Sequence, residues 1–190
     1  MIVYGMILNL REVPLAEAAA EKKLRSLANV HLVVQRSQYK LDLYSDTTLV
    51  KSYRAVFGKN NSSRKNQLEA YKTPVGKYMV CAVDSGSRYK KFLKINFPNS
   101  NDVTQAYNAG LITESDYEVA LDDLQNNVCP VIARLKLPEI GIHGNGRLNF
   151  ILKNLPFVYN WTNGSVAVSD ENIDEIYSVI KVGTEVEIKE

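Results

Sequence analysis

The sequence predicts a single, mainly β domain with helices at its periphery, arranged as a sandwich or a partly open barrel. The chain has 190 residues, which fits one domain and is long enough to bury a substantial core. From about residue 30 onward, short apolar or alternating runs are separated by turn residues, a pattern typical of strands. Helical patterns are confined to a stretch near the N-terminus and to two later patches.

The strands are predicted from their alternation and from the turns that bound them. Residues 39–44 (Tyr-Lys-Leu-Asp-Leu-Tyr) alternate with a period of two, as a half-buried strand does. Thr73-Pro-Val-Gly76 is a turn that leads into the next apolar run. Further strands are predicted at 49–57, 78–83, 92–97, 139–143, 164–168 and 184–188.

Three helices are predicted. Residues 14–28 are rich in Ala, Leu, Glu and Lys, and Pro14 is suited to the start of a helix. A second helix follows Thr113-Glu-Ser-Asp116, an N-terminal capping sequence. A third begins after Ser169, and its acidic residues at 170, 171, 174 and 175 suit the positive end of a helix. We therefore interpret these carboxylates as helix-start charge rather than as metal ligands.

Composition excludes several classes of function. A hydrophobic content of 45% and a charged content of 23% are ordinary for a soluble globular protein. A net charge of +2 is too small to indicate a nucleic-acid partner, and the basic cluster at 59–65 is interpreted as a solvated loop. No stretch approaches the roughly 20 apolar residues of a membrane span. The apolar start at residues 1–8 lacks the positive region of a signal peptide, so the export route stays open.

The two cysteines do not define a disulfide framework. Cys81 lies in an apolar run, where a small buried apolar side chain is the expectation, and Cys129 precedes Pro130 in a predicted loop. The sequence leaves open whether they pair. Neither has a histidine at metal-ligand spacing, so no metal site is predicted.

A histidine and a serine are the candidates for catalysis. His143 closes an apolar run and lies between Gly141 and Gly144, which allow close backbone approach, whereas His31 is expected to be structural. Ser165 follows a glycine turn and precedes an apolar run. The turn can be purely structural, or it can present the side chain near backbone N–H groups that hold an oxyanion, with a histidine taking the proton.

The segments Ile140-Gly-Ile-His-Gly144 and Trp161-Thr-Asn-Gly-Ser165-Val-Ala-Val168 resemble the catalytic signature of the L,D-transpeptidases, the YkuD-type domain that remodels bacterial peptidoglycan. Four more segments, in the same order, resemble one branch of that family: 72–78, 92–99, 110–117 and 170–177. The resemblance covers residues 31–188. We therefore expect an N-terminal helical segment at 1–30 and an L,D-transpeptidase-like catalytic domain at 31–190.

The resemblance implies a mixed β-sandwich of the L,D-transpeptidase catalytic-domain type, with peripheral α-helices, and a two-step acyl transfer that needs no cofactor. It assigns the general base to His143, the nucleophile position to Ser165 and oxyanion donors to the backbone N–H groups around Gly164 and Ser165. The expected substrate contacts are Trp161, Asn163 and Gly144. The implied partners are peptidoglycan stem peptides, and the implied location is the periplasm or cell envelope. Trp161 can instead fill the core.

The sequence departs from the family pattern at three positions. Asn163 stands where many members have a second histidine, and Ala167 where many have an arginine. Ser165 is the serious departure, because the family nucleophile is a cysteine and a serine hydroxyl has a far higher pKa than a thiol. We expect a loss of orders of magnitude in rate.

Three hypotheses remain open. The first is a transpeptidase whose cysteine has been replaced by serine, through engineering or recent evolution. The second is a natural pseudoenzyme that binds peptidoglycan without chemistry. The third is a serine-dependent peptidoglycan peptidase.

Overall fold

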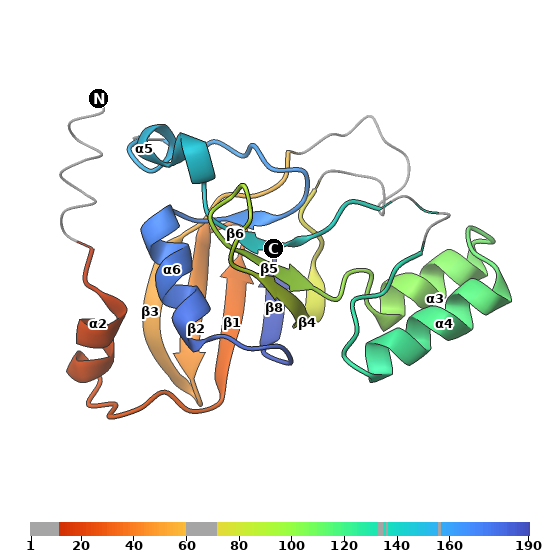
Figure 1. The fold of residues 1–190 in the computed structure, drawn as a ribbon, viewed down its shortest axis with the longest axis horizontal. Coiled ribbons are helices and arrows are strands. Elements are labelled where there is room, and N and C mark those ends of the chain that lie inside the picture. Colours follow the sequence, from red (N-terminus) through yellow and green to blue (C-terminus); the bar gives the residue numbers. More distant parts are fainter. Residues whose placement is uncertain (1–11, 60–71, 133–134, 136, 156) are drawn as a thin grey trace.

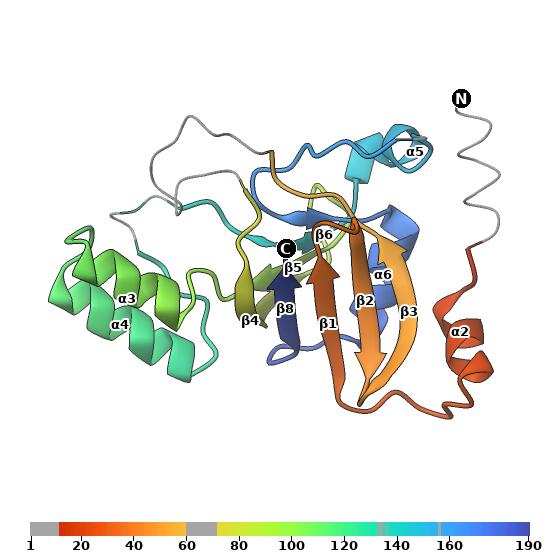
Figure 2. The same ribbon diagram turned by 180° about the vertical axis from the view of Figure 1, so that it is seen from behind.

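A computed structural model describes residues 12–59, 72–132, 135, 137–155 and 157–190 of the chain. They form one curled, mixed sheet of eight strands with helices around it (Figures 1 and 2). The predicted mainly β class with peripheral helices is therefore confirmed. The apolar start at 1–8 and most of the basic cluster at 59–65 lie outside the described residues.

The strands follow the predicted apolar runs, with shorter bounds at several ends. In chain order they are β1 (Val30–Gln35), β2 (Lys40–Ser45), β3 (Thr48–Arg54), β4 (Gly76–Asp84), β5 (Phe92–Ile95), β6 (Gly141–His143), β7 (Val166–Ala167) and β8 (Glu185–Lys189). Their order across the sheet is β3-β2-β1-β8-β4-β5-β6-β7. Among the strand pairs of the described residues, β1–β8 and β6–β7 are parallel and the others are antiparallel.

The sheet is curled, so its two edges approach each other. Just beyond β3, Val56 pairs with Ala167 of β7 through an isolated antiparallel bridge. Two reciprocal backbone hydrogen bonds, of 2.9 and 2.8 Å, join these residues. This single curled sheet agrees with the predicted sandwich or partly open barrel.

Helix α6 (Asp170–Val179) covers one face of the sheet (Figure 1). Its Ile173 and Ile176 are both 0% exposed and belong to the main apolar core. As predicted, it begins after Ser169, whose hydroxyl accepts a hydrogen bond from the Asn172 N–H at 3.2 Å. Packing of this apolar face against the sheet therefore fixes the position of the chain segment that follows β7.

Helices α3 (Ser100–Asn108) and α4 (Glu114–Gln125) form a hairpin that projects from one side of the sheet (Figure 1). The predicted capping box at the start of α4 is present, with Thr113 and Asp116 bonding reciprocally. Helix α3 was not predicted, although Asn99 and Asp102 form a similar box. The hairpin packs around a small apolar cluster of its own that includes Val103.

A disulfide between Cys81 in β4 and Cys129 after α4 ties this hairpin to the sheet. The expectation that Cys81 is simply a buried apolar residue was therefore wrong. The two cysteines are 48 residues apart in sequence, and only the packing of the hairpin beside β4 brings them together.

The remaining helices are short. Helix α2 (Leu15–Glu21) begins after Pro14 as predicted but ends at Glu21, well before residue 28. The turn η3 (Gly146–Leu148) and helix α5 (Asn149–Leu152) were not predicted. In the described part of the chain, no helix combines the length and the apolar character that crossing a bilayer requires.

Candidate active site

Strands β6 and β7 bring the two signature segments together. They run side by side in parallel, with Ile142 opposite Val166 and His143 opposite Ala167. Since alternate residues of a strand share a face, Ser165, just before β7, lies on the same face as His143. Both side chains line one cleft of about 660 Å³. The fold therefore places the two candidate catalytic residues in a common cavity.

The His143 ring is held in an aromatic setting. The side chain is 2% exposed. Its ring stacks on Tyr89, with centroids 4.4 Å apart, and lies 5.8 Å from the nearly parallel ring of Phe92. Trp161 approaches edge-on, with a centroid distance of 5.6 Å. These contacts fix the plane of the imidazole.

This setting also fixes the protonation state of His143. Burial is the main cause that lowers its pKa to about 4, and the positive charge of Arg88 acts in the same direction. The contact between Nδ1 and the Gly144 carbonyl oxygen, 2.6 Å long, partly opposes the shift. A carbonyl oxygen only accepts, so Nδ1 carries the proton and Nε2 is the basic nitrogen. At neutral pH the ring has the form that a general base requires.

The turn before Ser165 is held by a buried threonine. Gly164 has a φ of 111°, a backbone conformation that residues other than glycine rarely adopt. The Thr162 hydroxyl donates to the Ser165 carbonyl at 2.6 Å and accepts from the Gly164 N–H at 3.3 Å. The Thr73 hydroxyl donates to the same carbonyl at 3.4 Å. The backbone at the nucleophile position is therefore rigidly placed.

The Ser165 hydroxyl itself is bonded to β6 and not to the imidazole. The Gly141 N–H donates to Oγ at 3.2 Å, and Oγ is 3.5 Å from the Glu139 carbonyl oxygen. Although Ser165 and His143 are both described, no direct hydrogen bond joins them. His143 can take this proton only after the hydroxyl and the imidazole come within hydrogen-bond distance of each other. Of the two expected oxyanion donors, the Gly164 N–H is already engaged by Thr162.

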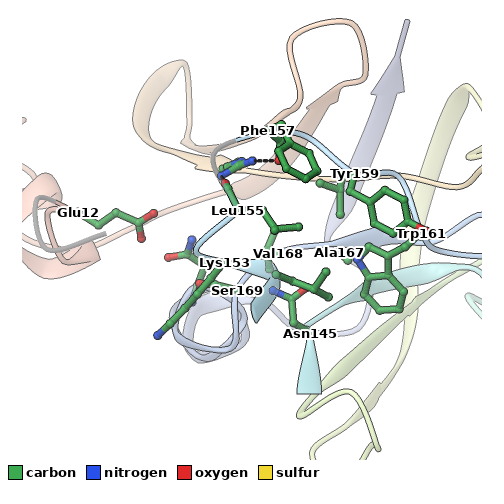
Figure 3. A pocket seen from close by; sticks show the side chains of 14 residues that line it. Glu12, Asn145, Lys153, Leu155, Phe157, Tyr159, Trp161, Ala167, Val168 and Ser169 are labelled. Atoms are coloured by element: carbon green, nitrogen blue, oxygen red, sulfur yellow. Dashed lines mark hydrogen bonds between the residues drawn. The ribbon is translucent and has the colours of Figure 1, made fainter. Parts of the chain in front are cut away.

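The three residues expected to contact substrate have different positions. Asn163 is exposed and lines the cleft with Ser165. Trp161 lines a different cavity, of about 40 Å³, with Phe157 and Tyr159 (Figure 3). Its buried Nε1 has no hydrogen-bond partner among the described residues. Gly144 is buried, and its contribution is the carbonyl that orients His143.

The glycines around His143 are required by close packing. A Cβ on Gly144 would lie 2.6 Å from Asp170 Oδ1 and 2.8 Å from the Tyr89 carbonyl oxygen. A Cβ on Gly141 would lie 2.7 Å from the Phe92 ring. Both ends of the short strand β6 are thus pressed against neighbouring segments, which holds His143 in place.

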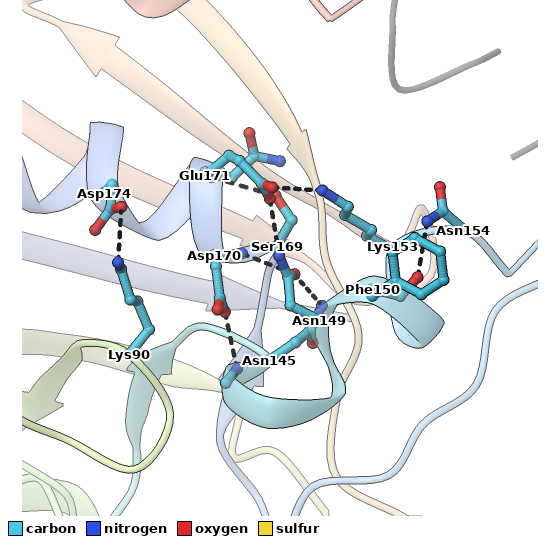
Figure 4. A network of polar contacts seen from close by, with 12 residues as sticks. Lys90, Asn145, Asn149, Phe150, Lys153, Asn154, Ser169, Asp170, Glu171 and Asp174 are labelled. Atoms are coloured by element: carbon cyan, nitrogen blue, oxygen red, sulfur yellow. Dashed lines mark hydrogen bonds and ion pairs between the residues drawn. The ribbon is translucent and has the colours of Figure 1, made fainter. Parts of the chain in front are cut away.

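A polar network joins the segment after β6 to the start of α6 (Figure 4). Asp170 Oδ1 accepts from the Gly146 N–H at 2.8 Å, and Asn149 Oδ1 accepts from the Asp170 N–H at 3.0 Å. Partial burial opposes the ionisation of Glu171, but hydrogen bonds from Lys153 and Asn149 lower its pKa to about 2. The carboxylates thus bond to the protein, and the described residues contain no group that could hold a metal ion.

Several neighbours of the site escaped prediction. The contacts of Tyr89 and Arg88 became visible only in the folded chain, because loop conformation decides them. Thr162 belongs to the recognised signature segment, but its hydrogen bonds were not foreseen. Thr73 had a signal, since the Thr-Pro-x-Gly turn was recognised, but its hydrogen bond to Ser165 was not foreseen.

Comparison with known proteins gives a consistent family. A model of the L,D-transpeptidase catalytic domain matches residues 29–188. The Bdellovibrio bacteriovorus protein Bd1075 has a similar fold, with a TM-score of 0.53 and 18% identity over 86% of this chain and 48% of that one. The chain thus spans about half the length of Bd1075. An L,D-transpeptidase from Xylanimonas cellulosilytica has a TM-score of 0.50 and 14% identity over 93% of this chain and 70% of that one. The search of curated proteins found no match.

Proposed function

The chain belongs to the L,D-transpeptidase catalytic domain family. We propose that its site is built for acyl transfer on peptidoglycan stem peptides, and that serine at the nucleophile position strongly impairs this reaction. The observation that carries this proposal is the shared cleft of Ser165 and His143. The burial that keeps the imidazole neutral supports it further.

The proposed roles follow the geometry. The side chain at position 165 attacks the carbonyl carbon of the third residue of a stem tetrapeptide, in the peptide bond to the fourth, while Nε2 of His143 takes its proton. The C–N bond then breaks, and His143 returns the proton to the departing amine of D-alanine. An amine of a second stem, or water, displaces the protein from the acyl group. The Gly144 carbonyl holds the imidazole in the required tautomer.

The impairment has two physical causes. A serine hydroxyl near neutral pH has almost none of the anionic form that makes a cysteine reactive. The hydroxyl is also bonded to the Gly141 N–H, so reaching the imidazole means giving up that bond. From these two causes we infer that the protein retains the substrate cleft but has lost most of its acyl-transfer activity.

The proposed location is the periplasm or cell envelope, where peptidoglycan lies. The disulfide between Cys81 and Cys129 supports this, because disulfides persist in oxidising compartments. No cofactor is needed in the proposed reaction.

The test compares the protein with its Ser165→Cys variant on tetrapeptide muropeptides, followed by mass spectrometry. We expect D-alanine release and crosslinked or trimmed products from the Ser165→Cys variant alone. Adding His143→Ala to that variant should abolish them. Equal products from the unaltered protein would show that serine is a working nucleophile, as in a peptidoglycan peptidase.

A non-catalytic binding role is the second candidate, and the bond between the Ser165 hydroxyl and Gly141 favours it. It predicts that muropeptides bind to the unaltered protein and that Ser165→Cys yields no product. Calorimetric titration with the same tetrapeptides separates this outcome from a complete absence of binding.

A further inference from the structure

Arg88 places a positive charge on the wall of the cleft. It lines the cavity that contains His143 and Ser165. Its guanidinium lies over the Tyr89 ring, 4.7 Å from the centroid, and one of its nitrogens donates to the Tyr89 hydroxyl at 2.8 Å. The side chain is exposed, so it can meet a ligand without first being uncovered.

Arg88 differs from its cationic neighbours because it has no carboxylate partner among the described residues. Lys90 and Lys91, which follow Tyr89 in the loop, pair with Asp174 at 3.6 and 2.8 Å. Lys94, which also lines the cleft, pairs with Glu139 at 2.8 Å. The positive charge of Arg88 is therefore available to an anion in the cleft.

The loop that bears Arg88 is firmly placed against the end of β6. A Cβ on Gly146 would collide with the Arg88 carbonyl oxygen, and a Cβ on Gly144 would lie 2.8 Å from the Tyr89 carbonyl oxygen. The ring of Tyr89 stacks on His143. Close packing against Gly144 and Gly146 thus fixes the backbone of Arg88 and Tyr89 relative to the His143 imidazole.

The separations suit a particular substrate group. The Tyr89 centroid is 4.7 Å from the guanidinium carbon and 4.4 Å from the His143 centroid, so their sum is an upper limit for the separation of Arg88 from the imidazole. The departing amine must come within about 3 Å of Nε2. In a C-terminal amino acid, the carboxylate carbon is about 2.5 Å from that nitrogen. With a further charge-assisted hydrogen bond of about 2.8 Å, these steps together span a distance comparable to that upper limit, so the carboxylate can meet the guanidinium.

We propose that Arg88 binds the carboxylate of the departing residue and thereby selects donor peptides in which the cleaved bond is the last one. An internal peptide bond would present a neutral amide at this position, which a guanidinium holds less strongly than a carboxylate. The inference rests on the proposed acyl transfer and assigns a specificity residue to it.

The kinetic test uses the Ser165→Cys variant and two tetrapeptide donors that differ only at the C-terminus, one a free acid and one an amide. We expect kcat/KM to favour the acid by about 10- to 100-fold. Arg88→Ala in that background should lower kcat/KM for the acid much more than for the amide and so remove this preference, and Arg88→Lys should keep part of it. Lys90→Ala, an exposed cation on the same loop, is the matched control and should leave the preference intact.

An equal loss of activity on acid and amide in Arg88→Ala would overturn the inference, since it would indicate a structural role. So would a Ser165→Cys variant that is active but has no preference for the acid.

Calorimetric binding of both peptides to the unaltered protein separates this inference from the proposed function. Acid-selective binding that Arg88→Ala abolishes supports the arginine subsite even when no variant turns over substrate. An absence of both binding and turnover would refute the two proposals together.

Discussion

The burial of His143 predicts a specific dependence of stability on pH. Burial, the main cause, lowers its pKa from 6.5 to about 4 in the folded state. The folded protein therefore resists protonating this ring, whereas the unfolded chain accepts the proton. One pKa unit corresponds to about 1.4 kcal/mol, so the protein should lose about 3 kcal/mol of unfolding free energy from this residue alone on acidification. The contribution is complete above pH 6.5 and is lost as the pH falls to about 4.

The perturbation that isolates this effect is His143→Phe. Phenylalanine keeps a ring among Tyr89, Phe92 and Trp161 but cannot be protonated. It loses the hydrogen bond to the Gly144 carbonyl, which lowers stability at every pH, so only the change with pH is compared. Urea denaturation from pH 7 to pH 4 should show a steeper decline for the unaltered protein than for His143→Phe.

Proton NMR gives an independent reading. The sequence has two histidines, so His31→Gln leaves one imidazole, whose resonance should shift near pH 4. Parallel stability curves for the unaltered protein and His143→Phe would refute this reasoning. A resonance that titrates near pH 6.5 would do so directly, because it would mean that water reaches the ring.

Three further predictions concern the frame around the site. Thr162→Val should lower the unfolding free energy by about 2 kcal/mol in urea denaturation, since it leaves the buried Gly164 N–H unpaired and removes the shorter of two hydrogen bonds to the Ser165 carbonyl; Thr162→Ser should retain most of the stability. Gly144→Ala should cost about 1–3 kcal/mol because its Cβ has no room, whereas Gly86→Ala, whose nearest neighbour is 3.6 Å away, should have little effect. Replacing Cys81 and Cys129 by alanine should cost about 4 kcal/mol, from a closed loop spanning 48 residues; equal denaturation midpoints with and without the bridge would contradict this.

The fold was predictable where local patterns decide the structure. Alternation located the strands, and the capping sequence at Thr113 located α4. Helix α3 was not predicted, although it has a similar box at Asn99 and buries Val103 and Ala106. Its packing against α4 stabilises it, and that contact is not visible in a short window of sequence.

The candidate site was predictable only in part. The glycines beside His143 and before Ser165 pointed to two special turns, and the family resemblance joined them. The roles of Tyr89 and Arg88 depend on how the loop at 85–91 folds onto β6, which no local periodicity encodes. The disulfide is similar, since two cysteines 48 residues apart pair only after the hairpin has packed.

The proposed impairment by serine at position 165 has a counterpart in stability that can be measured. Its hydroxyl accepts a hydrogen bond from the buried Gly141 N–H, and a thiol is a much weaker acceptor. Ser165→Cys should therefore lower the unfolding free energy by about 1 kcal/mol, even as it supplies a better nucleophile. Ser165→Ala removes the acceptor without adding a nucleophile, so it should be at least as destabilised and inactive. If Ser165→Cys were instead as stable as the unaltered protein, the bond to Gly141 would contribute nothing, and weak nucleophilicity alone would have to explain the impairment.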